Sequence, residues 1–194
     1  MKTLIIVDYQ NDFAHTKGAL YVPGGSEIKE KISTLLKSNA FHNVIATKDI
    51  HPQDHCSFKE QGGQWPSHCV VGSYGAEFAF AKELEQKIDY VLHKGRDKNV
   101  DSYSAFYDND RKHYTGLGSL ITFPPCEDER VYICGLALDY CVKYTAFDAL
   151  DFVENVYIVS DAVKAVEQDQ NNFETIYREL KVKGIKFVQT KEIV

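Results

Sequence analysis

Three side chains that can act together in nucleophilic catalysis, a thiol, a carboxylate and an ammonium, stand beside predicted strand ends in this chain. Cys141 follows the apolar run 131–134 and precedes a predicted helix. A thiol at such a junction meets the positive end of the helix dipole, which lowers its pKa and favours the thiolate. Asp8 and Lys94 each end another predicted strand. The carboxylate could accept the thiol proton while the ammonium stabilises both anions.

The same three residues also have an ordinary interpretation. Asp8 could cap a turn, Lys94 could be solvated, and Cys141 could be a small core residue, since cysteines are more often buried than catalytic. Spacing alone leaves both interpretations open.

A second group of residues has the chemistry of metal ligands. Asp49 and His51 are two residues apart at a predicted strand end, so they share one face of extended backbone. With a third ligand, either His55 or His68, they would form a divalent-metal site suited to zinc, iron or manganese. Cys69 is a competing ligand, and a solvated polar loop is the alternative.

Aromatic side chains lie in predicted loops near these strand ends. Phe13, Trp65 and Tyr103 are placed to form a wall for a flat ring. Phe106 could do the same or could anchor its loop in the core.

The elements that must position these groups alternate along the chain. Apolar runs predict strands at 3–7, 43–48, 90–94, 131–134, 156–159 and 185–188. Helical spacing predicts helices at 27–37, 76–86, 139–152 and 170–183. This alternation predicts a three-layer α/β/α fold with a six-stranded, mostly parallel sheet, as a single domain over residues 1–194. Ligands of such sheets bind outside the carboxyl ends of the strands, where the candidate residues lie.

Composition excludes several classes of function. The chain has 194 residues, 44% of them hydrophobic, and a net charge of −6, which argues against a nucleic-acid groove. It has no apolar run of about 18 residues and no recognisable signal peptide, so no membrane partner is expected. Five cysteines without a CxxC pair indicate reduced thiols and a cytoplasmic location.

Five short motifs occur in the order known from one family. They are DxQNDF at 8–13, DxHPxxHxSF at 49–58, WPxHC at 65–69, YSAF at 103–106 and GxAxxxC at 135–141. In these motifs the chain resembles the isochorismatase-like cysteine hydrolases, and among them the nicotinamidases. Each motif is short, but five in order are highly specific.

The resemblance implies an amidohydrolase that converts nicotinamide to nicotinate and ammonia through a cysteine thioester, in NAD salvage and often with pyrazinamide hydrolysis. It implies one divalent metal ion, zinc before iron or manganese. The expected partner is the small-molecule substrate, with no nucleic acid or membrane, and a homo-oligomer is left open.

The resemblance also implies a role for individual positions. The implied catalytic residues are Asp8, Lys94 and Cys141. The implied oxyanion hole consists of the backbone amides of Ala137 and Cys141, next to a cis peptide bond between Leu136 and Ala137. The implied metal ligands are Asp49, His51 and His68. The residues expected behind these ligands are Gln10, His55 and Ser57. The implied substrate-binding residues are Phe13, Trp65, Tyr103 and Ala105.

Two alternative functions remain at this point. An amidase of the same superfamily acting on a carbamoyl or ureido substrate would share the catalytic residues but would generally lack the metal segment. A non-catalytic binding module is the other alternative, and the intact set of Asp8, Lys94 and Cys141 argues against it. The segment 115–126 and the turn 151–155 depart from the usual pattern of the family, both away from the expected site.

Overall fold

One sheet with a single strand direction organises the molecule. The computed structural model describes residues 1–124, 126 and 128–194. Its strands are β1 (Lys2–Val7), β2 (Asn43–Asp49), β3 (Tyr90–Lys94), β4 (Arg130–Leu136), β5 (Asn155–Lys164) and β6 (Lys186–Val188). Their order in the sheet is β3-β2-β1-β4-β5-β6, and each neighbouring pair is parallel. The predicted six-stranded α/β fold is confirmed.

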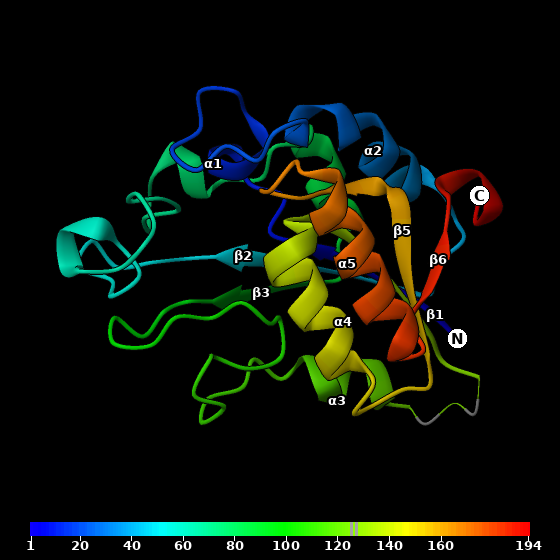
Figure 1. The fold of residues 1–194 in the computed structure, drawn as a ribbon. Coiled ribbons are helices and arrows are strands. Elements are labelled where there is room, and N and C mark those ends of the chain that lie inside the picture. Colours follow the sequence, from blue (N-terminus) through cyan, green and yellow to red (C-terminus); the bar gives the residue numbers. More distant parts are fainter. Residues whose placement is uncertain (125, 127) are drawn as a thin grey trace.

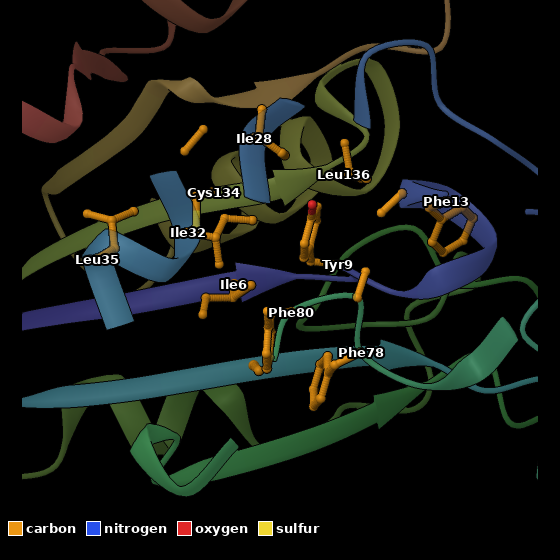
Figure 2. Packing of buried hydrophobic residues seen from close by; sticks show 14 of the residues in the cluster. Ile6, Tyr9, Phe13, Ile28, Ile32, Leu35, Phe78, Phe80, Cys134 and Leu136 are labelled. Atoms are coloured by element: carbon orange, nitrogen blue, oxygen red, sulfur yellow. The ribbon is translucent and has the colours of Figure 1, made fainter. Parts of the chain in front are cut away.

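Both faces of the sheet are covered, as Figure 1 shows. Along β1, Leu4 and Ile6 belong to one core cluster and Ile5 and Val7 to the other, which is the two-residue period of a buried strand. Helix α2 (Lys29–Lys37) covers the first face, and Figure 2 shows its apolar side chains against the sheet. The second face is covered by α3 (Leu117–Thr122), α4 (Lys143–Ala149) and α5 (Gln170–Val182).

Short helical segments complete the connections. The helix α1 (Asn11–Ala14) follows β1 directly. The 3₁₀ segments are η1 (Gly25–Ile28), η2 (Lys59–Gln61), η3 (Tyr74–Ala76), η4 (Lys82–Lys87) and η6 (Thr190–Glu192). The segment η5 (Leu138–Val142) is a π-helical turn between β4 and α4. Among the described residues, no helix is both long and apolar enough to cross a membrane.

The helix predicted at 76–86 is wrong. Ala76 ends the 3₁₀ segment η3 and the second half of the range forms the 3₁₀ segment η4, but residues 77–79 run extended beside the loop after β1. Asn11 N donates to the Glu77 carbonyl at 2.9 Å, and Ala79 N donates to the Tyr9 carbonyl at 2.9 Å. Phe78 and Phe80 stack at 4.8 Å within the core. Long-range backbone pairing therefore overrides the local helical spacing.

Gly135 allows β4 to pass close to β1 just before the candidate site. Its φ is +110°, and a Cβ atom there would stand 2.0 Å from the Val7 carbonyl oxygen. The register between β4 and β5 also shifts at this point. A glycine is required because a side chain would push apart the two strands that end at the site. In the atypical segment 115–126 the structure has the short helix α3, while Pro125 lies outside the described residues.

Candidate active site

Four neighbouring strands place polar side chains at one edge of the sheet. Asp8 follows β1, Asp49 ends β2, Lys94 ends β3, and Cys141 lies in η5 just after β4. These strands are parallel, so their carboxyl ends meet at the same edge, where α/β sheets bind ligands. The structure brings these four residues together, and the sequence placed each of them at or next to a strand end.

Lys94 lies at the centre of this group. Its Nζ atom is 2.9 Å from Asp8 Oδ2, 3.1 Å from Asp49 Oδ1 and 3.5 Å from Cys141 Sγ. It also donates to the Ser102 carbonyl at 2.6 Å. Lys94 is only 3% exposed, so the two carboxylates compensate its buried charge.

Asp8 is held by a residue of the neighbouring strand. Thr47 Oγ1 donates to Asp8 Oδ1 at 2.6 Å and accepts the Asp8 backbone N–H at 3.1 Å. The backbone of Asp8 has φ +46°, which is uncommon outside glycine and is often found at functional sites. Its other oxygen, Oδ2, pairs with the Lys94 ammonium at 2.9 Å, so the carboxylate lies between Thr47 and Lys94.

Burial controls the proton affinities of the group. Burial raises the pKa of the Cys141 thiol well above its usual value; Lys94 opposes this effect and Asp8 adds to it. The expectation of a lowered thiol pKa is therefore wrong for the resting site, because desolvation and neighbouring carboxylates outweigh the helix end. Burial also raises the pKa of Asp8, against the effect of Lys94. For Lys94, burial acts to lower the pKa, but Asp49 and Asp8 hold it well above its usual value.

A protonated thiol needs a base before it can attack. Asp8 is the candidate for that base, since its carboxylate adjoins both Lys94 and the Cys141 thiol and its raised pKa suits proton transfer. The geometry thus provides an acceptor for the thiol proton and a cation for the charge that develops.

Beside this group, three buried side chains converge on one point. Asp49 Oδ2 is 2.9 Å from His51 Nε2 and 3.7 Å from His68 Nε2, and the three potential ligand atoms lie within 4.8 Å of one another. The Nδ1 atoms of the two histidines face the carbonyls of Gly95 and Pro66, at 2.8 and 2.7 Å. An Nδ1–H bond to a carbonyl leaves Nε2 free as a ligand, which is typical of metal sites.

These residues fit a divalent metal ion. Two imidazoles and one carboxylate are the ligand types that suit zinc, iron or manganese. His51 and Lys94 hold the pKa of Asp49 well below its usual value, although burial acts in the opposite direction. The carboxylate is therefore ionised, as a ligand must be.

The residues expected behind the ligands lie where the sequence indicated. Gln10 donates to the Asp49 carbonyl and accepts the Asp49 N–H, both at 2.8 Å, so it fixes the backbone of a candidate ligand. The His55 ring lies 4.0 Å from the His51 ring, and its Nδ1 faces Ser57 Oγ at 2.7 Å. His55 does not belong to the group formed by Asp49, His51 and His68.

Cys69 is not a ligand in this arrangement. It is fully buried, its Sγ faces the Gly75 carbonyl at 3.9 Å, and its N–H donates to Asp12 at 2.7 Å. Burial raises the pKa of its thiol well above the usual value. Among the described residues, the group of potential ligand atoms around Asp49 includes His68 and does not include Cys69.

One pocket joins the thiol to the candidate metal ligands. Cys141, Asp49 and His68 all line it, together with aromatic and aliphatic side chains. The Phe13 ring lies 5.4 Å from the His68 ring, and the Trp65 ring lies 5.1 Å from Tyr140. An apolar pocket with a few convergent polar groups suits a small, flat ligand.

The remaining expected residues divide into two groups. Tyr103 lines the pocket, and its hydroxyl accepts from Trp65 Nε1 at 3.4 Å. Ala105 does not line the pocket, which corrects the expectation that it contacts substrate. It is fully buried in the core, where its N–H donates to Thr145 and its carbonyl accepts from Thr115.

The turn that carries the thiol has unusual backbone geometry. The peptide bond between Leu136 and Ala137 is cis, as the family resemblance implies. The Ala137 carbonyl then accepts from the N–H groups of both Tyr140 and Val142, at 3.1 and 3.0 Å. These bonds close the turn around Cys141.

Sequence reasoning missed several residues at the site. Thr47 lies two residues before Asp49 on β2, so the two-residue period could have revealed it. Tyr140 adjoins Cys141 and could have been included for that reason. No local signal marks the other missed lining residues, which are Leu20, Val22, Asp101, Leu136 and Val166.

The fold and the site together define the class. A buried thiol, carboxylate and ammonium at the carboxyl edge of an α/β/α sheet have the geometry expected of a cysteine-nucleophile hydrolase. The sequence pattern of the Isochorismatase domain matches residues 2–182, and the chain belongs to that family.

Known relatives are similar over nearly the whole chain. The nicotinamidase of Escherichia coli (strain K12) is 35% identical over 201 residues, which cover 94% of this chain and 92% of the relative. A crystal structure of an L. infantum relative in complex with nicotinate has a TM-score of 0.91 and 37% identity, covering 100% of this chain and 95% of the other. The pyrazinamidase of Pyrococcus horikoshii in complex with zinc has a TM-score of 0.83 and 38% identity, covering 97% and 98%.

Proposed function

We propose that this protein is a nicotinamidase, which hydrolyses nicotinamide to nicotinate and ammonia. The observation that carries the proposal is that Cys141, Asp49 and His68 line the same pocket, together with aromatic side chains. The similarity to a nicotinamidase and to a relative in complex with nicotinate supports the same substrate.

The proposed reaction begins with the transfer of the Cys141 proton to Asp8. The sulfur attacks the carboxamide carbon and forms a C–S bond, while the carbonyl electron pair moves to oxygen. Lys94 stays protonated and offsets the charges of the thiolate and of Asp8 and Asp49 nearby. The backbone amides of Ala137 and Cys141 would stabilise the oxyanion.

The tetrahedral intermediate then collapses to a thioester. The C–N bond breaks as Asp8 returns its proton to the leaving nitrogen, which departs as ammonia. A water activated by Asp8 adds to the thioester, and the C–S bond breaks to release nicotinate and restore the thiol. Phe13, Trp65 and Tyr103 would hold the pyridine ring throughout.

Asp49, His51 and His68 would hold one divalent metal ion, with zinc proposed first because a zinc complex is known for a similar pyrazinamidase. Such an ion supplies a Lewis acid that can bind the nitrogen of a pyridine or pyrazine ring. This arrangement supports pyrazinamide as a second substrate.

The proposal also covers the domain organisation, the cellular location and the metabolic role of the protein. Both core clusters pack on one sheet, which supports treating residues 1–194 as one domain. All five cysteines are free thiols, which supports a reducing, cytoplasmic location. Nicotinate production supports a role in NAD salvage.

Ammonia release from nicotinamide tests the proposed function. We expect turnover of nicotinamide and pyrazinamide but not of a simple aliphatic amide, which lacks the ring that the pocket holds. N-Carbamoyl and ureido substrates belong in the same assay. Preferential turnover of one of those would replace the proposal with the amidase alternative, and absence of turnover of every amide would favour a binding module.

Metal removal tests the proposed ligands directly. We expect one metal ion per chain by elemental mass spectrometry, and His68→Ala should lose most of it because only two ligands remain. His55→Ala should keep the ion and weaken its affinity by about 10- to 100-fold, since His55 packs behind His51.

Exposed His42, which belongs to none of the groups of potential metal ligands among the described residues, provides the control His42→Ala. A chelator should remove both the ion and the activity. Full metal content in His68→Ala, or complete loss in His55→Ala at saturating zinc, would contradict the ligand assignment.

A further inference from the structure

Asp139 connects the turn that carries the thiol to the opposite wall of the pocket. It lies in η5, two residues before Cys141, and its side chain is 8% exposed. Its Oδ1 accepts the backbone N–H of Val166 and its Oδ2 accepts that of Glu167, both at 3.0 Å. Neither of these bonds follows from local sequence, since 27 and 28 residues separate the partners.

The two connected segments both line the pocket. Cys141 and Tyr140 belong to the turn, while Val166 belongs to the loop between β5 and α5. A carboxylate that accepts two backbone N–H groups forms strong, directional bonds that fix two segments relative to each other. Asp139 thereby determines where the nucleophile lies relative to the pocket wall.

We propose that Asp139 is a positioning residue for the hydrolysis, acting through the 165–168 loop and the thiol-bearing turn rather than by contact with substrate. The inference rests on the proposed function, because the pocket must hold the ring while the thiol attacks. Small displacements of a nucleophile are costly, and a misplacement of about 1 Å can lower the rate by about 10²-fold.

The test uses two substitutions at Asp139, which remove one and then both of its hydrogen bonds to the backbone of Val166 and Glu167. In Asp139→Asn one oxygen can still accept an N–H, whereas Asp139→Ala accepts none. We expect kcat at saturating nicotinamide to fall by about 10-fold in the first variant and by about 100-fold in the second. Amide hydrogen exchange at Val166 and Glu167 should accelerate in the same order.

Asp161 offers a matched control at the same sheet. Its Oδ1 accepts from the Thr190 N–H at 2.8 Å and from the Thr190 hydroxyl at 2.9 Å, and it does not line the pocket. Asp161→Asn and Asp161→Ala should lower the melting temperature while kcat stays at the wild-type value. If Asp139 had only a structural role, its variants would likewise lower the melting temperature and leave kcat at the wild-type value.

Three results would overturn the proposal. They are a wild-type kcat in Asp139→Ala, an equal loss of kcat in Asp161→Ala, and unchanged amide exchange at Val166 and Glu167. If the wild-type protein releases no ammonia from nicotinamide, the proposed function fails by itself. The exchange measurement then still decides whether Asp139 joins the two segments.

Discussion

Replacing Cys141 with alanine is expected to reduce ammonia release from nicotinamide by about 10⁴-fold or more while the protein stays folded. Among the described residues, Cys141 is the only cysteine that lines the pocket. A nucleophile and its base act as a unit, so loss of one removes most of the rate. The side chain is small and lies at the pocket, so its truncation leaves the sheet and both core clusters intact. Steady-state ammonia release and circular dichroism measure the two effects.

Cys56 provides the matched control for this substitution. It is a half-buried free cysteine that does not line the pocket, so Cys56→Ala should keep wild-type turnover. Mass spectrometry with a nicotinoyl substrate would detect the acyl group on Cys141 and not on Cys56. Near-normal turnover in Cys141→Ala would exclude the nucleophile assignment.

Replacing Lys94 with methionine is expected to cost both activity and stability. The substitution leaves Asp8 and Asp49 buried and side by side without the cation that lies about 3 Å from each, at 2.9 and 3.1 Å. Removing one partner of a buried ion pair typically destabilises a protein by about 3–5 kcal/mol. For a chain of this size the melting temperature should fall by roughly 10 °C, and ammonia release should fall with it because the thiolate loses its counter-ion.

The exposed pair of Lys98 and Asp54 provides the comparison. Lys98 Nζ is 3.1 Å from the Asp54 carboxylate, but both side chains are more than half exposed. Lys98→Met should therefore leave the melting temperature and the turnover unchanged, because solvent screens the pair. Equal melting temperatures and equal turnover in Lys94→Met and Lys98→Met would show that the buried ion pairs of Lys94 have no special role.

Much of the fold follows from local patterns in the sequence. Strand β1 can be predicted because residues 4–7 are continuously apolar, as expected for a strand buried on both faces. Asp8, Asp49 and Lys94 can be placed at one edge because they directly follow such runs in a parallel sheet. The position of Cys141 at the start of a helix follows in the same way.

The features that sequence could not reveal depend on contacts between distant segments. The extended course of residues 77–79 depends on backbone bonds to residues 9–11. The hydrogen bond from Thr47 to Asp8 joins β2 to the end of β1. The buried position of Ala105 depends on its hydrogen bond to Thr145 in α4. The pKa of Cys141 could not be predicted from its helix position because desolvation is a property of the assembled site.

Burial of Cys141, which raises its thiol pKa, also bears on how well the thiol resists chemical damage between turnovers. Peroxides and electrophiles react with thiolates, and a cysteine that keeps its proton and is 8% exposed is a poor target for them. Reactivity would then arise only when an amide fills the pocket and Asp8 takes the proton. The proposed nucleophile would then be protected between turnovers and activated only during them.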